Sequence, residues 1–248
     1  MDNDNSSAMV CGPDGCDIAA TETQLPETAS AGTRIDIVSD AICPWCYVGK
    51  RQLERAFDLL EKQHLRFTVA WHPFQLNPDM PREGVDRAEY RLAKFGSLER
   101  SQQLDERLTE TAATVGLEFH LDRLTRTPNT LNAHRLIRFA GQRGVQDGVV
   151  EALFEGYFCN GADIGDDGVL TKLGEEGGLD RDEVAALLAS DAGLKEVAAA
   201  DRMARNAGIQ GVPSFALQGH VLFSGAVPAE EMVQAFRQAW DILKNRAA

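Results

Sequence analysis

Two cysteines that are separated by a proline and a tryptophan constrain this chain more than any other feature. Cys43 and Cys46 follow a strand-like apolar run at residues 34–38 and open a helix-like run at residues 47–57. Residues three apart on a helix lie on the same side, so the two sulfurs can reach the geometry of a disulfide. Cys43 lies at the expected N-terminus of that helix, where unpaired N–H groups and the positive end of the helix dipole stabilise a thiolate. The pattern therefore predicts a redox-active cysteine pair.

Two other interpretations of the cysteine pair stay open at this level. Cys-x-x-Cys is also a spacing of zinc ligands, and two buried cysteines can be inert. The position between a strand and a helix favours redox chemistry over both. In that chemistry Cys43 is the nucleophile, which forms a mixed disulfide with a substrate, and Cys46 resolves it. Pro44 fits the first helical turn without losing a hydrogen bond, and Trp45 offers apolar surface to a substrate, so both tune the site.

The charge of the chain argues against a nucleic-acid partner. With 25 basic and 38 acidic residues the formal net charge is −13, whereas binding to phosphates needs a basic patch. No apolar run approaches the ~18–20 residues that span a bilayer, so the sequence predicts no membrane partner either. We therefore expect neither nucleic acid nor a membrane as a partner of this protein.

Residues 1–33 differ in composition from the rest of the chain, with six acidic residues and no Lys or Arg. The segment lacks the basic and apolar regions of a secretory signal, so the sequence predicts a flexible acidic tail and a cytoplasmic location. Cys11 and Cys16 lie in this tail and are separated by four residues. They could form a second redox pair that exchanges electrons with Cys43 and Cys46, complete a four-cysteine zinc site, or be incidental thiols. We expect no resident metal.

The two ends of the remaining chain carry strand patterns, and the middle does not. Residues 34–80 and 203–248 combine short apolar or alternating runs with amphipathic helices. Residues 81–202 are almost entirely helical in pattern, with Gly and Asp clusters between the helices. The two outer pieces together have the size of one small domain. The sequence thus predicts a discontinuous α/β domain that is interrupted by an inserted all-helical domain.

With these patterns in place, the chain resembles the DsbA-like family of thioredoxin-fold oxidoreductases, in its FrnE branch. The most specific matches are the segment at residues 36–50 around the cysteine pair and the Gly-Val-Pro segment at residues 211–215. Segments at residues 71–78, 129–136 and 223–226 agree as well. The resemblance implies an α/β, thioredoxin-like fold with a large all-helical insertion. It also implies activity as a protein disulfide oxidoreductase or isomerase.

The resemblance further implies a cis peptide bond between Val212 and Pro213, beside the active-site sulfurs. A proline there removes an N–H group, and the backbone of Val212 can pair with an extended substrate peptide in the manner of an added strand. We therefore expect both residues to bind substrate. A rigid trans turn that opens the next strand is the alternative from the residues alone.

The first cysteine position separates the activities within this family. Relatives that isomerise 2-hydroxychromene-2-carboxylate, and kappa-class glutathione transferases, usually carry serine where this chain has Cys43. The presence of both Cys43 and Cys46 favours disulfide exchange with disulfide- or thiol-containing proteins. A glutathione-dependent isomerase or transferase is the alternative, and a non-catalytic holdase-like or metal-binding protein is a third hypothesis. We expect no bound cofactor: glutathione enters as a reductant or co-substrate, and glutathione or a thioredoxin system is the expected redox partner.

Five further residues carry expectations of their own. His72 and Ser214 depart from the family pattern and are expected near the substrate groove. The resemblance suggests that Asn129 helps to bind a small thiol. His134 lies in an apolar helical pattern, so we predict hydrogen-bonded packing for it. Cys159 follows two aromatic residues, so we predict a packing residue or a plain surface thiol there.

Overall fold

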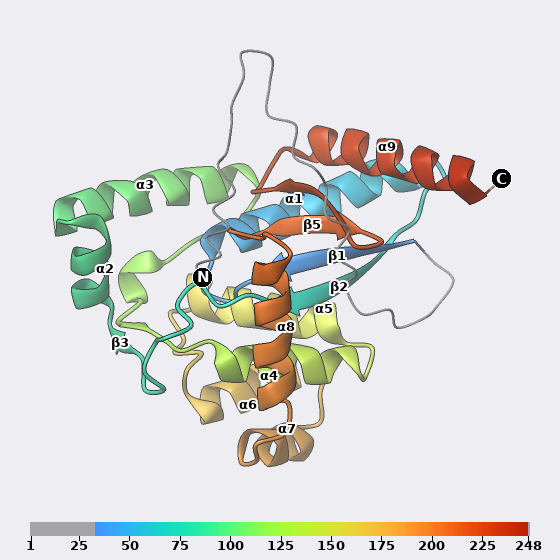
Figure 1. Cartoon of the computed structure of the whole chain (residues 1–248). Coiled ribbons are helices and arrows are strands. Elements are labelled where there is room, and N and C mark those ends of the chain that lie inside the picture. Colours follow the sequence, from blue (N-terminus) through green and yellow to red (C-terminus); the bar gives the residue numbers. More distant parts are fainter. Residues whose placement is uncertain (1–32, 248) are drawn as a thin grey trace, which may run out of the picture.

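A four-stranded sheet lies at the centre of the molecule (Figure 1). The computed structural model describes residues 33–247; residues 1–32, which contain Cys11 and Cys16, lie outside the described residues. The strand order is β2-β1-β5-β6, with β1 parallel to β2 and the other neighbours antiparallel. The strands are β1 (Arg34–Ser39), β2 (Thr68–Pro73), β5 (Ser214–Leu217) and β6 (His220–Ser224).

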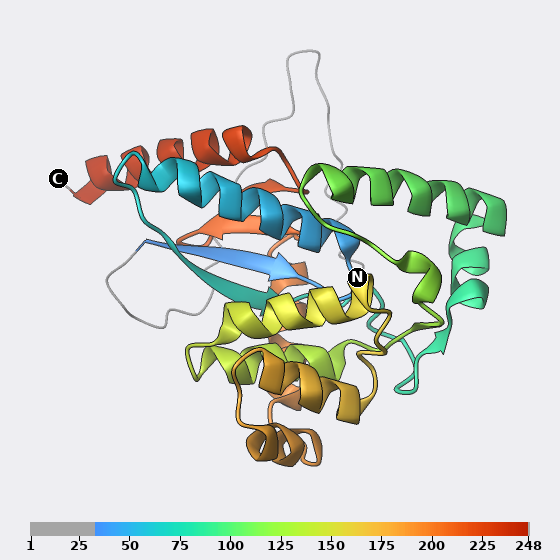
Figure 2. The same cartoon turned by 180° about the vertical axis from the view of Figure 1, so that it is seen from behind.

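Helices cover the sheet on both sides (Figure 2). On one side α1 (Pro44–Glu61) lies along α9 (Ala229–Ala247). On the other side three helices contact β2, namely α4 (Leu131–Gly141), α5 (Gln146–Phe154) and α8 (Leu194–Asn206). Because β1 lies inside the sheet and both faces are covered, it is buried along nearly its whole length, which explains its continuous apolar pattern.

The apolar spacing of α1 fixes which side of the helix packs on the molecule. Leu53, Ala56 and Leu60 repeat at helical spacing and are fully or almost fully buried. Phe57 completes the stripe, and its ring lies 6.4 Å from the ring of Phe236 on α9. The predicted amphipathic helix thus finds its partners in the sheet and in the last helix of the chain.

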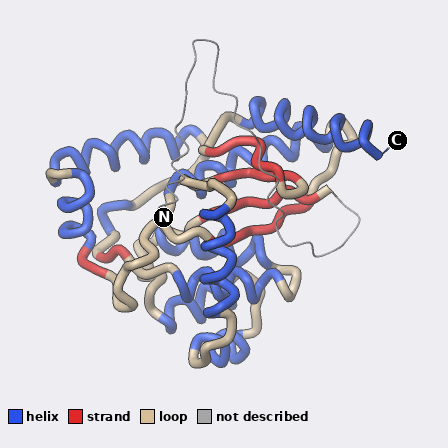
Figure 3. Tube along the Cα trace, viewed as in Figure 1, coloured by secondary structure: helices blue, strands red, loops and turns tan. Residues whose placement is uncertain are grey.

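The chain leaves the sheet after β2 and returns to it at β5. Between them lie a two-stranded ribbon and a series of helices that surround one end of the sheet (Figure 3). In chain order these elements are β3 (Val85–Asp86), α2 (Arg87–Phe95), α3 (Leu98–Thr114), the 3-10 helix η1 (Leu121–Arg123), β4 (Arg126–Thr127), α4, α5, the π-helical turn η2 (Glu155–Cys159), α6 (Asp167–Glu176), α7 (Arg181–Leu188) and α8.

The predicted α/β fold with a large helical insertion is confirmed. The ribbon of β3 and β4 is the one departure from an all-helical insertion in the part of the chain that the structure describes. Each of its strands has two residues, which is too short to give an alternating pattern. The expected domain boundaries stay predictions, and the boundary after residue 202 falls inside α8.

Helices α2 and α3 project from the body of the molecule as an arm (Figure 1). Helix α3 contacts α1, and Leu108 and Ala112 in its C-terminal half are buried in the hydrophobic core. By contrast, α2 has no buried residue. Asp86 caps its start by accepting a hydrogen bond from the N–H of Glu89, and Gly96 ends it in the left-handed conformation. The arm therefore presents a well-defined but largely solvent-exposed helix.

Candidate active site

The cysteine pair lies where β1 ends and α1 begins. Cys43 is the N-cap residue of α1, and Pro44 occupies the first turn. The N–H of Cys43 donates to the carbonyl of Asp40, and the N–H of Cys46 donates to the carbonyl of Cys43, both at 3.0 Å. Both cysteines are free thiols. Cys43 is 4% exposed and Cys46 is completely buried, so Cys43 is the one that a substrate can reach.

Burial raises the pKa of the Cys46 thiol well above its usual value. A hydrogen bond and the charge of Cys43 raise it further. Hydrogen bonds from the hydroxyl of Ser39 and the backbone N–H of Asp40 act in the opposite direction and are too weak to reverse the shift. Cys46 is therefore held as a protonated thiol behind Cys43.

The loop that opens β5 lies directly against the first cysteine. The thiol of Cys43 donates to the carbonyl oxygen of Val212 at 3.5 Å, and the Val212–Pro213 peptide bond is cis, the isomer that the resemblance implies. Gly49 lets α1 approach this loop, because a Cβ atom at that position would lie 3.0 Å from Cγ of Pro213. Since β5 pairs with β1 immediately after Pro213, the sheet itself holds a backbone carbonyl beside the nucleophile.

A buried aspartate and histidine support the turn that carries the cysteines. Asp40 is completely buried, and one of its carboxylate oxygens lies 3.2 Å from Nε2 of His134, which is 2% exposed. The other carboxylate oxygen accepts a hydrogen bond from the N–H of Leu76 at 2.7 Å. Asp40 was not singled out from the sequence. The available signal was a charged residue at the end of an apolar strand, three positions before Cys43.

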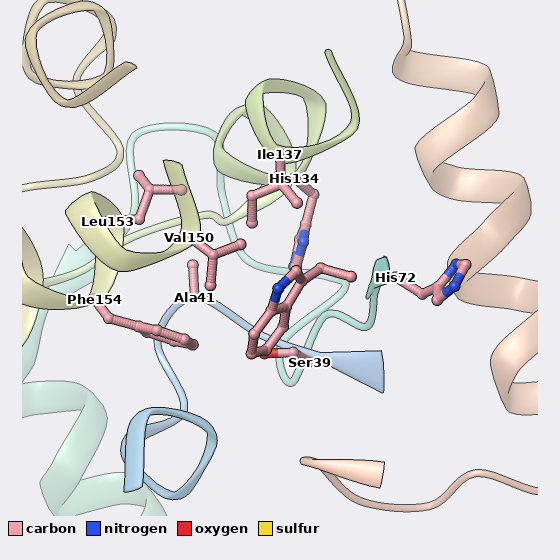
Figure 4. A pocket seen from close by; sticks show the side chains of 9 residues that line it. Ser39, Ala41, His72, His134, Ile137, Val150, Leu153 and Phe154 are labelled. Carbon is pink, nitrogen blue, oxygen red and sulfur yellow. The ribbon is translucent and has the colours of Figure 1, made fainter. Parts of the chain in front are cut away.

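The histidine also borders a small cavity that residues of β1, β2, α4 and α5 line (Figure 4). The cavity has a volume of about 10 Å³, which is at the lower limit of what can hold one water molecule, and Ser39, Trp71 and His134 are among its polar lining residues. His72 lines the cavity as well, but its imidazole ring points away from the other labelled side chains in Figure 4, and its Nε2 atom lies 2.8 Å from the carboxylate of Asp36. Ser39 thus reaches both this cavity and the buried thiol of Cys46.

One turn beyond Cys46, a buried lysine ties α1 to α5. Lys50 is 3% exposed, and its ammonium group lies 2.9 Å from Glu151, 3.2 Å from Asp147 and 2.5 Å from Glu54. Burial by itself lowers the pKa of Lys50, but the three carboxylates outweigh it and the pKa is raised. Glu151 also accepts a hydrogen bond from the hydroxyl of Tyr47 at 2.7 Å. The cluster fixes the active-site helix on the inserted domain.

A groove of about 390 Å³ opens beside Cys43. Trp45 and Val212 form its wall on the side of the sheet domain, and α2 and α3 form the opposite wall. Pro44 lines it as well. The sequence-predicted site residues Cys43, Pro44, Trp45 and Val212 therefore meet at one groove, with Cys46 and Pro213 directly behind.

Three other residues that the sequence singled out do not line the groove. His72 and Ser214 are expected near it, and the polar groups of both contact other residues. Ser214 is 1% exposed and its hydroxyl pairs with the carbonyl of Gly211 and the hydroxyl of Ser224. Asn129 donates to the carbonyl of Met80 and accepts from the N–H of Leu131, so its two polar atoms tie the start of α4 to the segment after β2. Its role with a small thiol stays a prediction.

Two features bear on other functions. Among the described residues, no three His, Cys, Asp or Glu side chains are grouped so that they could hold a metal ion. Within residues 33–247, no helix combines the length and the apolar character that crossing a membrane requires.

A family model for the DSBA-like thioredoxin domain matches residues 34–237. Among curated proteins, YwbO of Bacillus subtilis (strain 168) is 30% identical over 146 residues, which are 59% of this chain and 66% of YwbO. The match thus spans a little less than two thirds of that relative. Among solved structures, a probable DsbA oxidoreductase from Streptomyces coelicolor has 35% identity and a TM-score of 0.76, covering 84% of this chain and 90% of its own. The cytosolic disulfide reductase DsbM from Pseudomonas aeruginosa, solved with GSH, has 18% identity and a TM-score of 0.57, covering 86% and 99%.

Fold, cysteine pair and family model agree on one class, the thioredoxin-fold proteins of the thiol–disulfide kind. The chain belongs to the DsbA-like thioredoxin-domain family.

Proposed function

We propose that the protein exchanges disulfides with protein substrates, with Cys43 as the nucleophile and Cys46 as the resolving cysteine. The main support for this proposal is the position of the Cys43 thiol. Cys43 is the N-cap residue of α1 and lines a groove, and the second thiol, Cys46, is buried behind it. The Cys43 thiolate attacks a substrate disulfide, which forms a mixed disulfide and releases one substrate thiolate. Cys46 then attacks Cys43, which releases the second substrate thiolate and leaves the Cys43–Cys46 disulfide.

The environments of the two thiols impose an order on these steps. The raised pKa of Cys46 keeps it protonated while Cys43 reacts. The Cys46 proton must leave before resolution, and the thiolate released from the substrate takes up a proton in the same cycle. In the reverse direction, a substrate thiolate attacks Cys43 of the oxidised protein, and Cys46 leaves as a thiolate that takes up a proton. A second substrate thiolate then displaces Cys43 from the mixed disulfide, which forms the substrate disulfide and reduces the protein.

The groove supplies the contacts that a polypeptide substrate needs. The carbonyl of Val212 lies beside Cys43, where the backbone of an extended substrate can pair with it. Trp45 is 44% exposed at the rim and offers apolar surface. Pro44 and Pro213 shape the two backbone segments that meet at the sulfurs.

Reduction of insulin disulfides by dithiothreitol tests the proposal. The wild-type protein should accelerate it, Cys43→Ser should abolish the acceleration, and Cys46→Ser should stall as a mixed disulfide that mass spectrometry detects. Cys159→Ser is the matched control, since Cys159 lies outside the pair, and it should retain the full rate. Equal rates for the wild type and both active-site variants would exclude disulfide exchange and leave the non-catalytic hypothesis.

A glutathione-dependent isomerase or transferase is the second candidate, because the groove beside Cys43 has the volume of a small-molecule pocket, typically about 300–1,000 Å³. In that reaction Cys43 holds or activates glutathione, and Cys46 is dispensable. Turnover of 2-hydroxychromene-2-carboxylate by Cys46→Ser at the wild-type rate would support this candidate.

Partners and location belong to the same proposal. Disulfide- or thiol-containing proteins are the substrates, and glutathione or a thioredoxin system returns the pair to its starting state. The FrnE branch and the cytoplasmic location are part of the proposal too. Cell fractionation, and a redox titration of the Cys43–Cys46 pair in glutathione buffers, would test the location and the direction of electron flow.

A further inference from the structure

The groove beside Cys43 differs from the rest of the molecule in its charge. Three basic residues line it, Arg87, Arg91 and Lys94, against one acidic residue, Asp105. The chain as a whole carries a formal net charge of −13. A local positive wall on such a protein is not explained by average composition, and it lies on the side of the groove that faces the nucleophile.

The three basic residues come from one helix, the exposed α2 of the arm. Asp105 of α3 binds two of them, with 3.2 Å to Arg87 and 2.6 Å to Arg91. These ion pairs hold α2 against α3, and they engage the only carboxylate that lines the groove within the described residues. The wall is therefore positioned by its own ion pairs and keeps a net positive charge.

Lys94 is the basic residue that remains available at the rim. Its ammonium group donates to the hydroxyl of Tyr90 at 2.8 Å and lies 5.1 Å from the centre of that ring. Among the described residues, no carboxylate lies within ion-pair distance of Lys94. An anionic group that enters the groove would therefore meet a cation that is held by an aromatic neighbour and is not yet neutralised.

The floor and the rim of the groove are apolar. Trp45, Leu76 and Leu104 are 44%, 37% and 37% exposed, which places them among the eight exposed large hydrophobic side chains of the described part of the chain, and all three line this groove. Such exposed apolar surface next to a reactive group marks a binding site for apolar side chains. Glutathione has no apolar side chain to place there, whereas a polypeptide segment has.

We propose that the groove selects polypeptide disulfides in which the reactive cysteine is flanked by an apolar residue and by acidic residues. The apolar side chain contacts the patch of Trp45, Leu76 and Leu104, and the acidic residue pairs with Lys94 on α2. This inference rests on the proposed disulfide exchange and names its substrate class. Opposite charges also steer encounter, so the selection acts on the association step.

A neighbouring pocket is lined by carboxylates, so the positive region does not extend beyond the groove. It shares Arg87, Arg91 and Asp105 with the groove but also carries Glu106, Glu110 and Asp122. Those carboxylates would repel an acidic segment that extended past the two arginines. The acidic residue of the substrate is thereby directed to the end of α2 where Lys94 lies.

Two symmetrical peptide disulfides of equal length provide the test. Both place leucine before the cysteine; one continues with two glutamates and the other with two lysines. Reduced enzyme attacks each peptide disulfide, releases two peptide thiols in two steps and becomes oxidised at Cys43–Cys46, so the thiols can be counted without a further reductant. We expect the acidic peptide to react about three- to tenfold faster at low salt, and the preference to shrink at 0.5 M salt.

Lys94→Glu is the decisive variant, and Lys195→Glu is its matched control. Both replace an exposed helix lysine, and Lys195 on α8 does not line the groove. Lys94→Glu should remove or reverse the preference for the acidic peptide, whereas Lys195→Glu should keep it. Far-UV circular dichroism checks that both variants are folded.

The outcomes separate this inference from the function on which it rests. If wild type reacts with both peptides at the same rate, charge selection is wrong and disulfide exchange stands. If wild type reacts with neither, the proposed function itself fails. If Lys94→Glu and Lys195→Glu reduce the preference for the acidic peptide equally, the preference comes from the net charge of the protein and not from the groove. If Lys94→Glu slows the reaction with glutathione disulfide as much as it slows the reaction with the acidic peptide, the assignment to polypeptide substrates is wrong.

Discussion

Three cysteines of the described residues differ in what surrounds their sulfurs. Cys43 faces the groove, Cys46 is completely buried, and Cys159 is partly buried. Burial, with the nearby carboxylates of Glu155 and Glu151, raises the pKa of Cys159 to about 11. Because only the thiolate is nucleophilic, environment and not residue type decides which thiol reacts. The prediction that Cys159 is a packing residue or a plain surface thiol is consistent with this environment.

Alkylation should therefore be selective. At pH 7 a thiol with a pKa of about 11 is thiolate in roughly one molecule in ten thousand, so Cys159 should react with iodoacetamide far more slowly than Cys43. Cys46 should also be slow, because its pKa is raised and its sulfur is buried. Peptide mapping by mass spectrometry over pH 6 to 10 measures each site. Labelling of Cys159 as fast as Cys43 at pH 7 would contradict the prediction.

Helix α1 carries both the redox pair and the anchor that holds it. Cys43 and Cys46 lie in its first turn, and Lys50 follows one turn later on the buried side. Burial by itself raises the pKa of Glu151, but Lys50, Tyr47 and Arg51 outweigh it, and the pKa of Glu151 is lowered. Removing a partner of a buried charge leaves the remaining charge without compensation, so this cluster couples the position of α1 to α5.

The same cluster should make stability depend on pH. Because the folded-state pKa of Glu151 is lowered, its stabilising contribution is present above the unfolded pKa of about 4.3 and is lost as the pH falls below it. Glu151→Gln should lower the free energy of unfolding by about 1–3 kcal/mol at pH 7, and the difference from wild type should narrow at pH 3.5. Urea unfolding at both pH values measures this.

The control for this element is Glu175→Gln on α6. Glu175 forms a surface ion pair with Arg181 at 2.9 Å, and such pairs contribute little. Its effect should stay below about 1 kcal/mol at both pH values. A deficit of Glu151→Gln that remains constant or grows on acidification would show that the charge of Glu151 does not stabilise the junction.

At the scale of the whole molecule, the sheet and the insertion share one hydrophobic core. Buried residues of β1 and α1 belong to the same cluster as those of α4, α5 and α6. Phe154 of α5 joins the parts directly, since its ring lies 5.1 Å from Tyr47 on α1 and 6.2 Å from Trp71 on β2. A continuous core of this kind makes the two parts depend on each other for stability.

We therefore expect one cooperative unfolding transition. Phe154→Ala should lower the free energy of unfolding by about 3–5 kcal/mol, because it removes a side chain that is 1% exposed. Within each protein, wild type or variant, the thermal unfolding curves measured by circular dichroism and by tryptophan fluorescence should coincide. Ile242→Ala on α9 is the control, since Ile242 is 48% exposed, and it should change stability by less than about 0.5 kcal/mol. Two separated transitions would mean that the insertion folds on its own.

The sequence by itself determined the features whose signals are local. A strand that is buried on both faces gives a continuous apolar run, and an amphipathic helix repeats every three to four residues. Both patterns fit within one element, so the order of elements, the helical insertion and the cysteine pair at a strand-to-helix junction could be predicted. The β3–β4 ribbon was not predicted, because each of its strands has only two residues and two residues cannot show an alternating pattern.

The tertiary structure decided how distant residues meet these cysteines. Val212 lies 169 positions from Cys43; the family resemblance implies that the two meet, and the pairing of β5 with β1 is what brings them together. His134 lies 94 positions from Asp40, and nothing in its helical pattern names that partner. The partners of His72 and Ser214, namely Asp36 and the carbonyl of Gly211, also follow from the pairing of strands and loops and not from a local pattern. The basic wall of α2 beside the nucleophile arises in the same way, from packing between segments far apart in the chain.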